Sequence, residues 1–251
     1  MNDKVAVIIL AAGLGKRMKS GKAKVLHEVL GKSMILYVLE TAQAIAGNNL
    51  IAVIGHQAEI VRKKVSGAFK VEFAYQDEQL GTGHAVKCAI PHIAENVENI
   101  IILCGDVPLI SRNTLKSLFE YHLETKRDIS ILAVDVDEPK GYGRIIMDDS
   151  GNVSGIKEEA DATADEKSIK TVNSGIYCIT KECLLKSINE IKADNAQEEY
   201  YLTDIISIAY NKKKSIGALR GQDQKELIGI NSLQDLNMAE NFMQHTVNNN
   251  F

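Results

Sequence analysis

Short apolar runs rich in isoleucine and valine alternate with amphipathic stretches through the first half of the sequence. This alternation constrains the fold more than any other feature, because apolar runs of this length and composition favour strands and the stretches between them favour helices. The expected strands are 5–10, 50–54, 71–75, 100–103 and 129–134, and the expected helices are 34–46, 59–66, 82–90 and 113–125. Such alternation with short connections predicts an α/β fold with a Rossmann-like, mostly parallel, mixed sheet covered on both faces.

The pattern becomes irregular after residue 135. Turn residues at 148–152 between two apolar runs predict a hairpin, and the polar stretch 161–168 predicts a mobile loop. The remaining expected elements are a strand at 172–179, helices at 181–191 and 202–210, and a last helix from a Ser232 cap to about residue 247.

Length and composition fit a globular protein, with 251 residues of which 45% are hydrophobic and 25% charged. We expect one domain over residues 1–251, divided into a nucleotide-binding half (1–135), a substrate-covering half (136–230) and a C-terminal helix (231–251). A net charge of −4 with scattered lysines predicts neither a nucleic acid nor a membrane partner. The first apolar run is too short for a signal peptide or membrane span, and the four cysteines contain no CxxC pair. We therefore expect a soluble cytoplasmic protein with free thiols.

A loop of small residues and cations, Leu-Ala-Ala-Gly-Leu-Gly-Lys-Arg-Met, follows the first expected strand. Its backbone N–H groups can approach an anion closely, and ligands of open parallel sheets bind beyond the carboxyl ends of strands. A dinucleotide fingerprint would need glycine where Met18 stands, and a Walker loop before Gly31-Lys32-Ser33 would need glycine at Leu26. Arg17 and Lys24 remain as cations for polyphosphate oxygens, and the alternative is a glycine-rich turn with solvated lysines.

Two further stretches of ligand-binding type follow the third and fourth expected strands. The first contains Gln76, whose amide can read the edge of a base, and Gly81 and Gly83 at the start of an expected helix. We interpret His84 in that helix as a packing or capping residue. The second stretch puts the Asp106 carboxylate at the end of a central strand, where one carboxylate plus phosphate oxygens is the usual way to hold Mg²⁺. The alternative for Asp106 is a turn residue or a helix cap.

These segments together resemble the sugar-nucleotide pyrophosphorylase family of nucleotidyltransferases, and among them the N-acetylglucosamine-1-phosphate uridylyltransferase domains. The resemblance covers nearly the whole chain and rests on residues 10–18 with 24–26, 76 with 79–85, 105–109, 141–145, 173–176 and 195–204. It implies a nucleotide-diphospho-sugar transferase fold of the glycosyltransferase-A-like kind. It also implies transfer of a uridylyl group from UTP to N-acetylglucosamine 1-phosphate with release of pyrophosphate, as in peptidoglycan precursor biosynthesis.

The resemblance also assigns roles to residues. It implies catalytic contacts to the phosphates from Arg17, Lys24 and Asp106, and a Mg²⁺ cofactor held by Asp106 and Asn231. It assigns the nucleotide to Ala11, Ala12, Gly13, Gln76, Gly81 and Thr82, and the sugar to Gly143, Glu158 and Asn173 together with Thr82. We expect no general base, because a phosphate monoester is already anionic at neutral pH.

The chain departs from the family pattern at two site positions. Leu14 stands where the loop is often basic, and Cys104 stands where an aromatic residue is frequent. Bifunctional members continue into a β-helix of hexapeptide repeats that carries an acetyltransferase and forms a trimer, and the 251 residues contain no such repeat. We therefore expect no acetyltransferase activity and no β-helix trimer, while the oligomeric state stays open.

Three other functions fit part of the sequence. The same reaction with another sugar 1-phosphate or nucleotide would use the same first loop, with changes near Cys104 and residues 161–168. A regulatory nucleotide-binding protein that has lost catalysis would not need the full set of cationic and metal-binding side chains. An NAD-linked dehydrogenase is disfavoured by Met18 and by the lack of an acidic residue for the ribose after the second strand.

Overall fold

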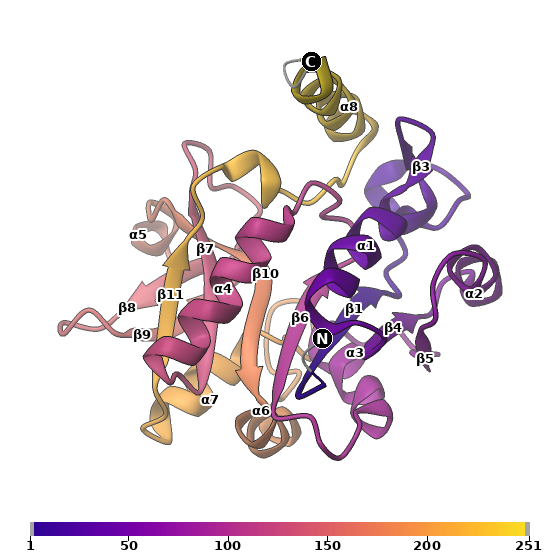
Figure 1. Cartoon of the computed structure of the whole chain (residues 1–251). Coiled ribbons are helices and arrows are strands. Elements are labelled where there is room, and N and C mark those ends of the chain that lie inside the picture. Colours follow the sequence, from indigo (N-terminus) through magenta and orange to yellow (C-terminus); the bar gives the residue numbers. More distant parts are fainter. Residues whose placement is uncertain (1–2, 249–251) are drawn as a thin grey trace.

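The computed structural model describes residues 3–248, except for the side chains of Lys16 and of residues 245–248. Within that part of the chain, nine strands form one sheet whose central path runs β11-β7-β10-β6-β1-β4-β5 (Figure 1). The strands of this path are β1 (Val5–Ala11), β4 (Leu50–Ile54), β5 (Glu72–Tyr75), β6 (Asn99–Cys104), β7 (Ile129–Asp135), β10 (Thr171–Thr180) and β11 (Ile216–Arg220). The hairpin of β8 (Arg144–Met147) and β9 (Val153–Lys157) extends from β10.

The sheet is mixed but mostly parallel, as the sequence predicts. β1 pairs in parallel with both β4 and β6, β4 with β5, and β11 with β7. β10 is antiparallel to both of its neighbours, β6 and β7. The expected hairpin at 148–152 is confirmed, because β8 and β9 pair across that turn. The backbone of β10 is irregular between Asn173 and Tyr177, where its register against β7 shifts.

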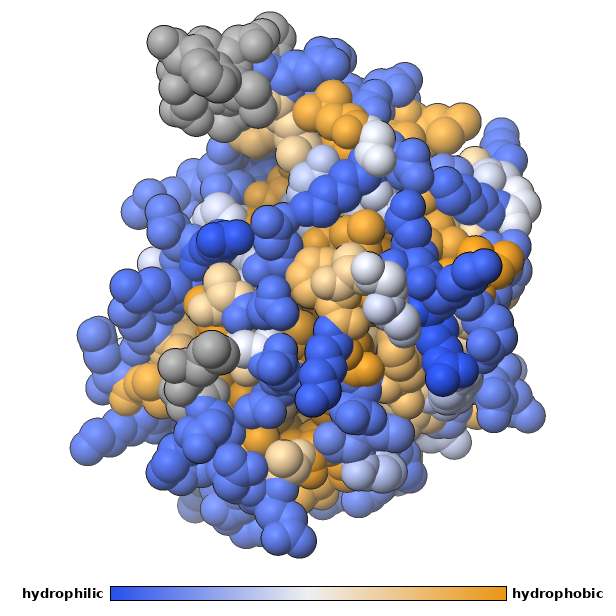
Figure 2. Space-filling model, turned by 45° about the vertical axis from the view of Figure 1, so that its right-hand side comes forward, coloured by the Kyte–Doolittle hydropathy of each residue, from blue (hydrophilic) through white to orange (hydrophobic). Residues whose placement is uncertain are grey.

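Helices cover both faces of the sheet and enclose two separate apolar cores. Successive β1 residues alternate between them, with Val7 and Ile9 in one core and Ala6 and Ile8 in the other, because strand side chains point to opposite faces. The first core packs under α1 (Met34–Ala46), α2 (Ala58–Ser66) and α4 (Arg112–Thr125), and the second under α3 (Thr82–Ala89), α6 (Lys181–Ser187) and α7 (Asp204–Asn211). In the space-filling view of one face, hydrophilic side chains dominate the outside and apolar atoms show in patches between them (Figure 2).

Three expectations for the second half need correction. The segment 161–168 is not a plain loop, because it contains the short helix α5 (Ala164–Lys167), which Thr163 and Glu166 stabilise with a reciprocal capping box. The helix expected at 181–191 ends at Ser187 and continues as a 3₁₀ turn, η4 (Ile188–Glu190). The helix expected from residue 202 begins at Asp204, because the preceding residues form turns.

The last helix, α8 (Leu233–Asn248), lies apart from the sheet at the top of Figure 1. Ser232 Oγ accepts a hydrogen bond from the Asp235 amide at 3.2 Å, as the expected cap requires. α8 packs through Ala239 against the two-stranded ribbon of β2 (Glu28–Val29) and β3 (Lys32–Ser33). Residues 249–251 of the expected C-terminal helix lie outside the described residues. No described helix is both long and apolar enough to cross a bilayer.

Short 3₁₀ turns complete the structure, and two of them shape the loop after β1. They are η1 (Lys16–Met18), η2 (Lys24–Leu26), η3 (Ile90–His92) and η5 (Gln224–Glu226). The loop after β1, the loop after β5 and the loop after β6 all leave the sheet at the carboxyl ends of its parallel strands, with β6 next to β1 and only β4 between β1 and β5. A ligand that reaches one of these loops can therefore reach all three.

Candidate active site

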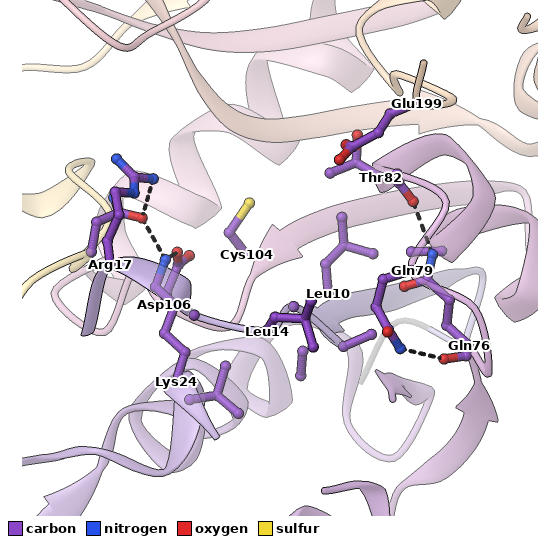
Figure 3. Close-up of a pocket in the computed structure, with 18 of the residues that line it drawn as sticks. Leu10, Leu14, Arg17, Lys24, Gln76, Gln79, Thr82, Cys104, Asp106 and Glu199 are labelled. Carbon is purple, nitrogen blue, oxygen red and sulfur yellow. Dashed lines mark hydrogen bonds and ion pairs between the residues drawn. The ribbon is translucent and has the colours of Figure 1, made fainter. Parts of the chain in front are cut away.

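A pocket of about 480 Å³ opens at this edge of the sheet (Figure 3). It is lined by Leu10, Ala11, Ala12, Gly13, Leu14, Gly15, Arg17, Lys24, Val25, Gln76, Gln79, Gly81, Thr82, Ala85, Cys104, Asp106, Gln197, Glu199 and Asn231. Polar and charged side chains gather at its two ends, with glutamines at one end and the cations with Asp106 at the other (Figure 3). The pocket is therefore suited to an elongated ligand with an anionic part and a part that can form directional hydrogen bonds.

Two cations and two oxygen ligands meet at the anionic end of the pocket. Lys24 Nζ forms an ion pair with Asp106 Oδ2 and donates to Asn231 Oδ1 at 2.6 Å. Arg17 Nη2 donates to the same Asn231 oxygen at 2.7 Å. Side-chain hydrogen bonds thus link all four residues, which the sequence places in three distant segments, in the order Arg17, Asn231, Lys24 and Asp106. Their arrangement offers fixed donors for phosphate oxygens on a partly desolvated wall.

The backbone beside Asp106 brings Asn231 to this point. The amide of Ile230 donates to the carbonyl of Asp106 at 2.8 Å, which ties the approach to α8 to the loop after β6. The backbone amides of Asn231 and Ser232 both donate to Asp235 Oδ2, at 2.8 and 2.9 Å. Asn231 is therefore held from both sides, and the sequence separation from Asp106 is bridged by backbone hydrogen bonds.

The side chains of Asp106 and Asn231 fit a hard divalent cation. A carboxylate oxygen and an amide oxygen converge on one point, which the Lys24 ammonium occupies. Such oxygens are the ligands that Mg²⁺ takes, and two protein ligands leave room for phosphate oxygens and water. Among the described residues, no group of three or more His, Cys, Asp or Glu side chains could hold a metal without help. A metal here would accordingly depend on substrate oxygens.

The opposite end of the pocket is built from glutamines and close backbone. Gln76 is 3% exposed, and its Nε2 donates to the Gly81 carbonyl at 2.9 Å. Gly81 has a φ of +112°, and a Cβ there would lie 2.6 Å from the Tyr200 carbonyl oxygen, so only glycine fits. The backbone of Ala11, Ala12 and Gly13 lines the pocket beside it. These contacts fix the position of the Gln76 amide and of the Gly81 backbone in the pocket wall.

The three residues expected to contact a sugar lie together, next to the pocket rather than in its lining. A Cβ on Gly143 would be 3.4 Å from both Glu158 carboxylate oxygens, and the amide of Asn173 donates to the Gly143 carbonyl at 2.9 Å. The Cys104 thiol, which does line the pocket, donates to the Gly175 carbonyl at 3.6 Å and so joins the two regions. Burial raises the pKa of Glu158, although its hydrogen bond with Thr203 acts in the opposite direction.

Thr82 lies at the junction between the pocket and this neighbouring cluster. Its Oγ1 accepts a hydrogen bond from the Leu202 amide at 3.0 Å, and its side chain is part of the pocket lining. In Figure 3 it stands beside Glu199, across the pocket from Asp106. A ligand with a sugar in this region would therefore pass Thr82 on the way from one end to the other.

A family model for nucleotidyl transferases matches residues 6–239. The chain belongs to the nucleotidyl transferase family. It is 43% identical over 241 residues to the bifunctional protein GlmU of Clostridioides difficile, which covers 96% of this chain and 52% of that protein. It is 46% identical over 247 residues to the bifunctional protein GlmU of Caldanaerobacter subterraneus, covering 98% and 53%. The chain thus spans about half the length of the curated relatives it matches.

A solved structure confirms the fold of this nucleotidyl transferase. HddC from Yersinia pseudotuberculosis, complexed with GMP-PN, superposes with a TM-score of 0.69 at 23% identity, covering 95% of this chain and 99% of that one. The predicted nucleotide-diphospho-sugar transferase fold and the predicted enzyme class, a nucleotidyltransferase, are therefore confirmed.

Several pocket residues of this nucleotidyl transferase were not assigned from the sequence. Gln197 and Glu199 belong to the Asn-Ala-Gln-Glu-Glu-Tyr block, and they reach the pocket because the Asn195 side chain folds that turn. Asn195 Nδ2 donates to the Glu199 carbonyl at 2.6 Å, and the Tyr200 amide then pairs with the Leu80 carbonyl at 2.8 Å. The asparagine at the head of a polar turn was the available signal.

Gln79 was also missed, although it lies in the same glutamine-rich stretch as Gln76. Its Nε2 donates to the Gln76 carbonyl at 3.0 Å, and Figure 3 shows the two side chains next to each other. The spacing of the two glutamines, three residues apart, is compatible with a turn that presents both to one ligand.

Proposed function

We propose that this chain transfers a uridylyl group from UTP to N-acetylglucosamine 1-phosphate, giving UDP-N-acetylglucosamine and pyrophosphate. The observation that carries the proposal is the convergence of Arg17, Lys24, Asp106 and Asn231 at one end of a pocket whose other end carries Gln76 and Gly81. Further support comes from the 42–46% identity to GlmU proteins over at least 96% of this chain. UTP and the sugar phosphate are the proposed partners, and Mg²⁺ is the proposed cofactor.

In the proposed reaction, an oxygen of the sugar phosphate attacks the α-phosphorus of UTP. A new P–O bond forms, the bond from the α-phosphorus to the bridging oxygen breaks, and pyrophosphate leaves with the electron pair. Lys24 stabilises negative charge on the α-phosphate, and Arg17 stabilises the departing pyrophosphate. The catalytic gain comes mainly from holding two anions in line, so no side chain has to remove a proton.

Asp106 and Asn231 would hold the Mg²⁺ ion, whose charge offsets the repulsion between the two phosphates when it is bound. Lys24 has to leave Asp106 for this to happen, since its ammonium lies between the two oxygen ligands. The flexible lysine side chain can turn from Asp106 toward an incoming phosphate while its Cα stays in place. Nucleotide and metal would then enter the site together.

The proposed sugar contacts are Gly143, Glu158 and Asn173, with Thr82 between them and the nucleotide. Glu158 offers a carboxylate acceptor for a sugar hydroxyl. Gly143 packs closely beside it, because a Cβ there would lie 2.9 Å from Ile156 Cγ2 and 3.4 Å from both Glu158 carboxylate oxygens. The proposed base contacts are Gln76 and Gly81. Ala11, Ala12 and Gly13 would border the nucleoside through their backbone.

Pyrophosphate release with UTP and Mg²⁺ tests this function, with N-acetylglucosamine 1-phosphate compared with glucose 1-phosphate and N-acetylgalactosamine 1-phosphate. A clear preference for the N-acetylglucosamine substrate supports the proposal. Release with none of the three, while UTP still binds in calorimetry, would instead support a nucleotide-binding protein without catalysis.

The same reaction with another sugar 1-phosphate is the second candidate, and Cys104 is the observation that favours it. This small side chain stands at the border between the pocket and the proposed sugar contacts, 3.6 Å from the Gly175 carbonyl. A larger side chain at 104 would narrow that border. Higher kcat/KM with glucose 1-phosphate than with N-acetylglucosamine 1-phosphate would favour this candidate.

A further inference from the structure

The orientation of one buried amide at the glutamine end of the pocket is fixed by its neighbours. Gln76 Nε2 lies 2.9 Å from the carbonyl oxygen of Gly81 and 3.1 Å from Nδ1 of His84. A carbonyl oxygen only accepts hydrogen bonds, so the atom beside it must be the amide nitrogen and not Oε1. The Gly81 carbonyl therefore excludes the flipped form of the Gln76 amide.

The same logic fixes the tautomer of His84. The amide nitrogen of Gln76 only donates, so His84 Nδ1 must accept and carries no proton. A neutral imidazole of this kind carries its proton on Nε2, which lies 3.8 Å from the sulfur of Cys88, a weak acceptor. The contacts of Gln76 Nε2 with Gly81 and His84 thus fix one amide orientation and one tautomer, and the Cys88 sulfur can accept from Nε2 in that tautomer.

Helix α3 holds His84 in this place. His84 lies in its first turn, and the amide of the neighbouring Gly83 donates to the Tyr200 carbonyl at 2.7 Å. A Cβ on Gly83 would come within 2.9 Å of that carbonyl, so the helix start is packed closely against the 195–204 segment. The start of the helix that carries His84 is therefore held by backbone contact with Tyr200.

This arrangement leaves one atom of the Gln76 amide for a ligand. Both protons on Nε2 are directed to Gly81 and His84, and Oε1 has no hydrogen-bond partner among the residues that the structure describes. Gln76 lines the pocket, where Figure 3 shows it near Gln79. The pocket wall therefore presents a hydrogen-bond acceptor at this point. A base edge with an N–H group satisfies it, while a ring nitrogen with a lone pair would leave two acceptors facing each other.

We propose that His84 is a positioning residue for nucleobase choice. By accepting one proton of the Gln76 amide, it holds Oε1 toward the base and so favours bases of the uracil type, which carry a ring N–H, over cytosine, whose equivalent nitrogen is an acceptor. The inference rests on the proposed function, because it takes this end of the pocket as the base site.

Two substitutions at His84 distinguish a role in positioning the Gln76 amide from a role in packing alone. His84→Phe keeps a ring of similar size and removes the acceptor, whereas His84→Asn is smaller but offers an amide oxygen near the position of Nδ1. His92→Phe is the matched control, because His92 is exposed in η3 and outside the pocket lining. For each variant, KM is measured for UTP, for CTP and for the sugar phosphate, and the binding of UTP and CTP without sugar is measured by calorimetry.

We expect His84→Phe to raise the KM for UTP about tenfold, the effect of one net hydrogen bond. The preference for UTP over CTP should fall by a similar factor, while the KM for the sugar phosphate stays within about twofold. His84→Asn should restore UTP binding to within about threefold of the wild type. An unchanged UTP-over-CTP preference in His84→Phe, or equal losses for UTP and the sugar phosphate, would overturn the role of His84.

Calorimetry tests the preference for UTP over CTP independently of the proposed reaction, because it measures binding without turnover. A wild-type protein that binds UTP over CTP but releases no pyrophosphate with N-acetylglucosamine 1-phosphate refutes the proposed reaction and leaves the role of His84 open to the same variants. A wild-type protein with no preference between UTP and CTP refutes the inference on Gln76 and His84 by itself.

Discussion

Lys24 Nζ lies 2.6 Å from Asn231 Oδ1, although 207 positions separate the two residues in the chain. The same nitrogen pairs with Asp106, so the ammonium occupies the point on which both oxygen ligands converge. A lysine in this position keeps the two oxygens together without a metal, because it neutralises the carboxylate. It must also compete with any divalent cation that these oxygens would bind.

Removal of that competitor gives the first prediction. Lys24→Met should raise the affinity of the nucleotide-free protein for Mn²⁺ by about tenfold, because a positive charge leaves the site. It should also lower kcat by about a hundredfold, since a donor to the α-phosphate is lost. Mn²⁺ binding followed by electron paramagnetic resonance and pyrophosphate release measure the two effects. Lys22→Met, on the exposed part of the same loop, is the control and should change neither.

The second prediction concerns the oxygen ligands themselves. Asp106→Ala and Asn231→Ala should each lower kcat/KM by about a hundredfold or more, while the Tm changes little, because both side chains lie at the edge of the pocket. Asp137→Ala is the matched control, since the Asp137 side chain is 96% exposed. Pyrophosphate release and thermal unfolding test this prediction. Activity near that of the wild type in either site variant would refute the assignment of Asp106 and Asn231 as Mg²⁺ ligands.

The third prediction concerns the glycine that borders the base end. Gly81→Ala should destabilise the protein by about 2 kcal/mol, because φ is +112° and the new Cβ would meet the Tyr200 carbonyl at 2.6 Å. The KM for UTP should rise as the Gly81 carbonyl moves away from Gln76. Gly155→Ala should change stability by less than about 0.5 kcal/mol, since nothing lies within 4 Å of its Cβ position. Urea unfolding of the two variants compares these costs, and equal values would refute the prediction.

An ion pair between the buried Arg144 and the partly exposed Glu159, next in the chain to Gly143 and Glu158, gives the fourth prediction. Arg144 Nη2 lies 2.7 Å from Glu159 Oε2, and the Arg144 side chain is 2% exposed. Arg144 also donates to the Tyr142 carbonyl, and Glu159 accepts from the Gly141 amide at 3.1 Å, so the pair holds the 141–143 turn in place. Arg144→Lys keeps the charge but loses the planar fork. It should lower the Tm and raise the KM for the sugar phosphate about tenfold, with the KM for UTP unchanged.

A second arginine-to-lysine variant serves as the control for Arg144→Lys. Arg220→Lys changes another arginine that is paired with an acidic side chain, Asp135, but whose own side chain is 70% exposed. Its KM values and Tm should stay close to those of the wild type, because exposed pairs contribute little. If Arg144→Lys raised the KM values for UTP and sugar phosphate to the same extent, the pair would support the whole site and not the turn in particular.

Much of the architecture of the first half could be predicted from the sequence, because it is encoded locally. β1 and the loop after it are contiguous, and the isoleucine and valine content of β1 indicates a buried strand directly. The reach of Asn231 to Asp106 could not be derived, since it depends on the backbone hydrogen bond from Ile230 across the molecule. Resemblance alone suggested that pair.

The second half was harder to predict for a related reason. β10 is antiparallel to both β6 and β7, but its residues would fit a parallel strand equally well. Its direction could therefore not be predicted from its own sequence. The helix α5 follows from a capping box, Thr163 with Glu166, inside a polar stretch that composition alone assigns to a loop. The role of His84 depended on a tautomer, which only the contacts of Gln76 reveal.

The fifth prediction is a loss of stability in mild acid, caused by His122. This imidazole is 2% exposed, with Nδ1 2.9 Å from Ser130 Oγ and Nε2 3.1 Å from Asn99 Oδ1, and burial lowers its pKa to about 4. Between pH 6.5 and about 4 the unfolded chain therefore binds a proton that the native imidazole does not. The free energy of unfolding should fall as pH is lowered through that window, by about 3 kcal/mol at most.

Urea unfolding of the wild type and of His122→Gln at pH 7 and pH 4.5 measures this contribution. His122→Gln has no titrating group at the position, so its free energy of unfolding should fall less between the two pH values, whatever its stability at pH 7. His92→Gln, which replaces an exposed histidine, should retain the wild-type dependence. An equal fall in the wild type and in His122→Gln between pH 7 and pH 4.5 would refute the contribution of His122. Carboxylates such as Asp128 act in a different window, because burial raises its pKa but hydrogen bonds with Ser215 and Lys214 lower it by more. Their loss of stability is expected below about pH 4, because a carboxylate with a lowered pKa stabilises the native state until the pH falls toward that pKa.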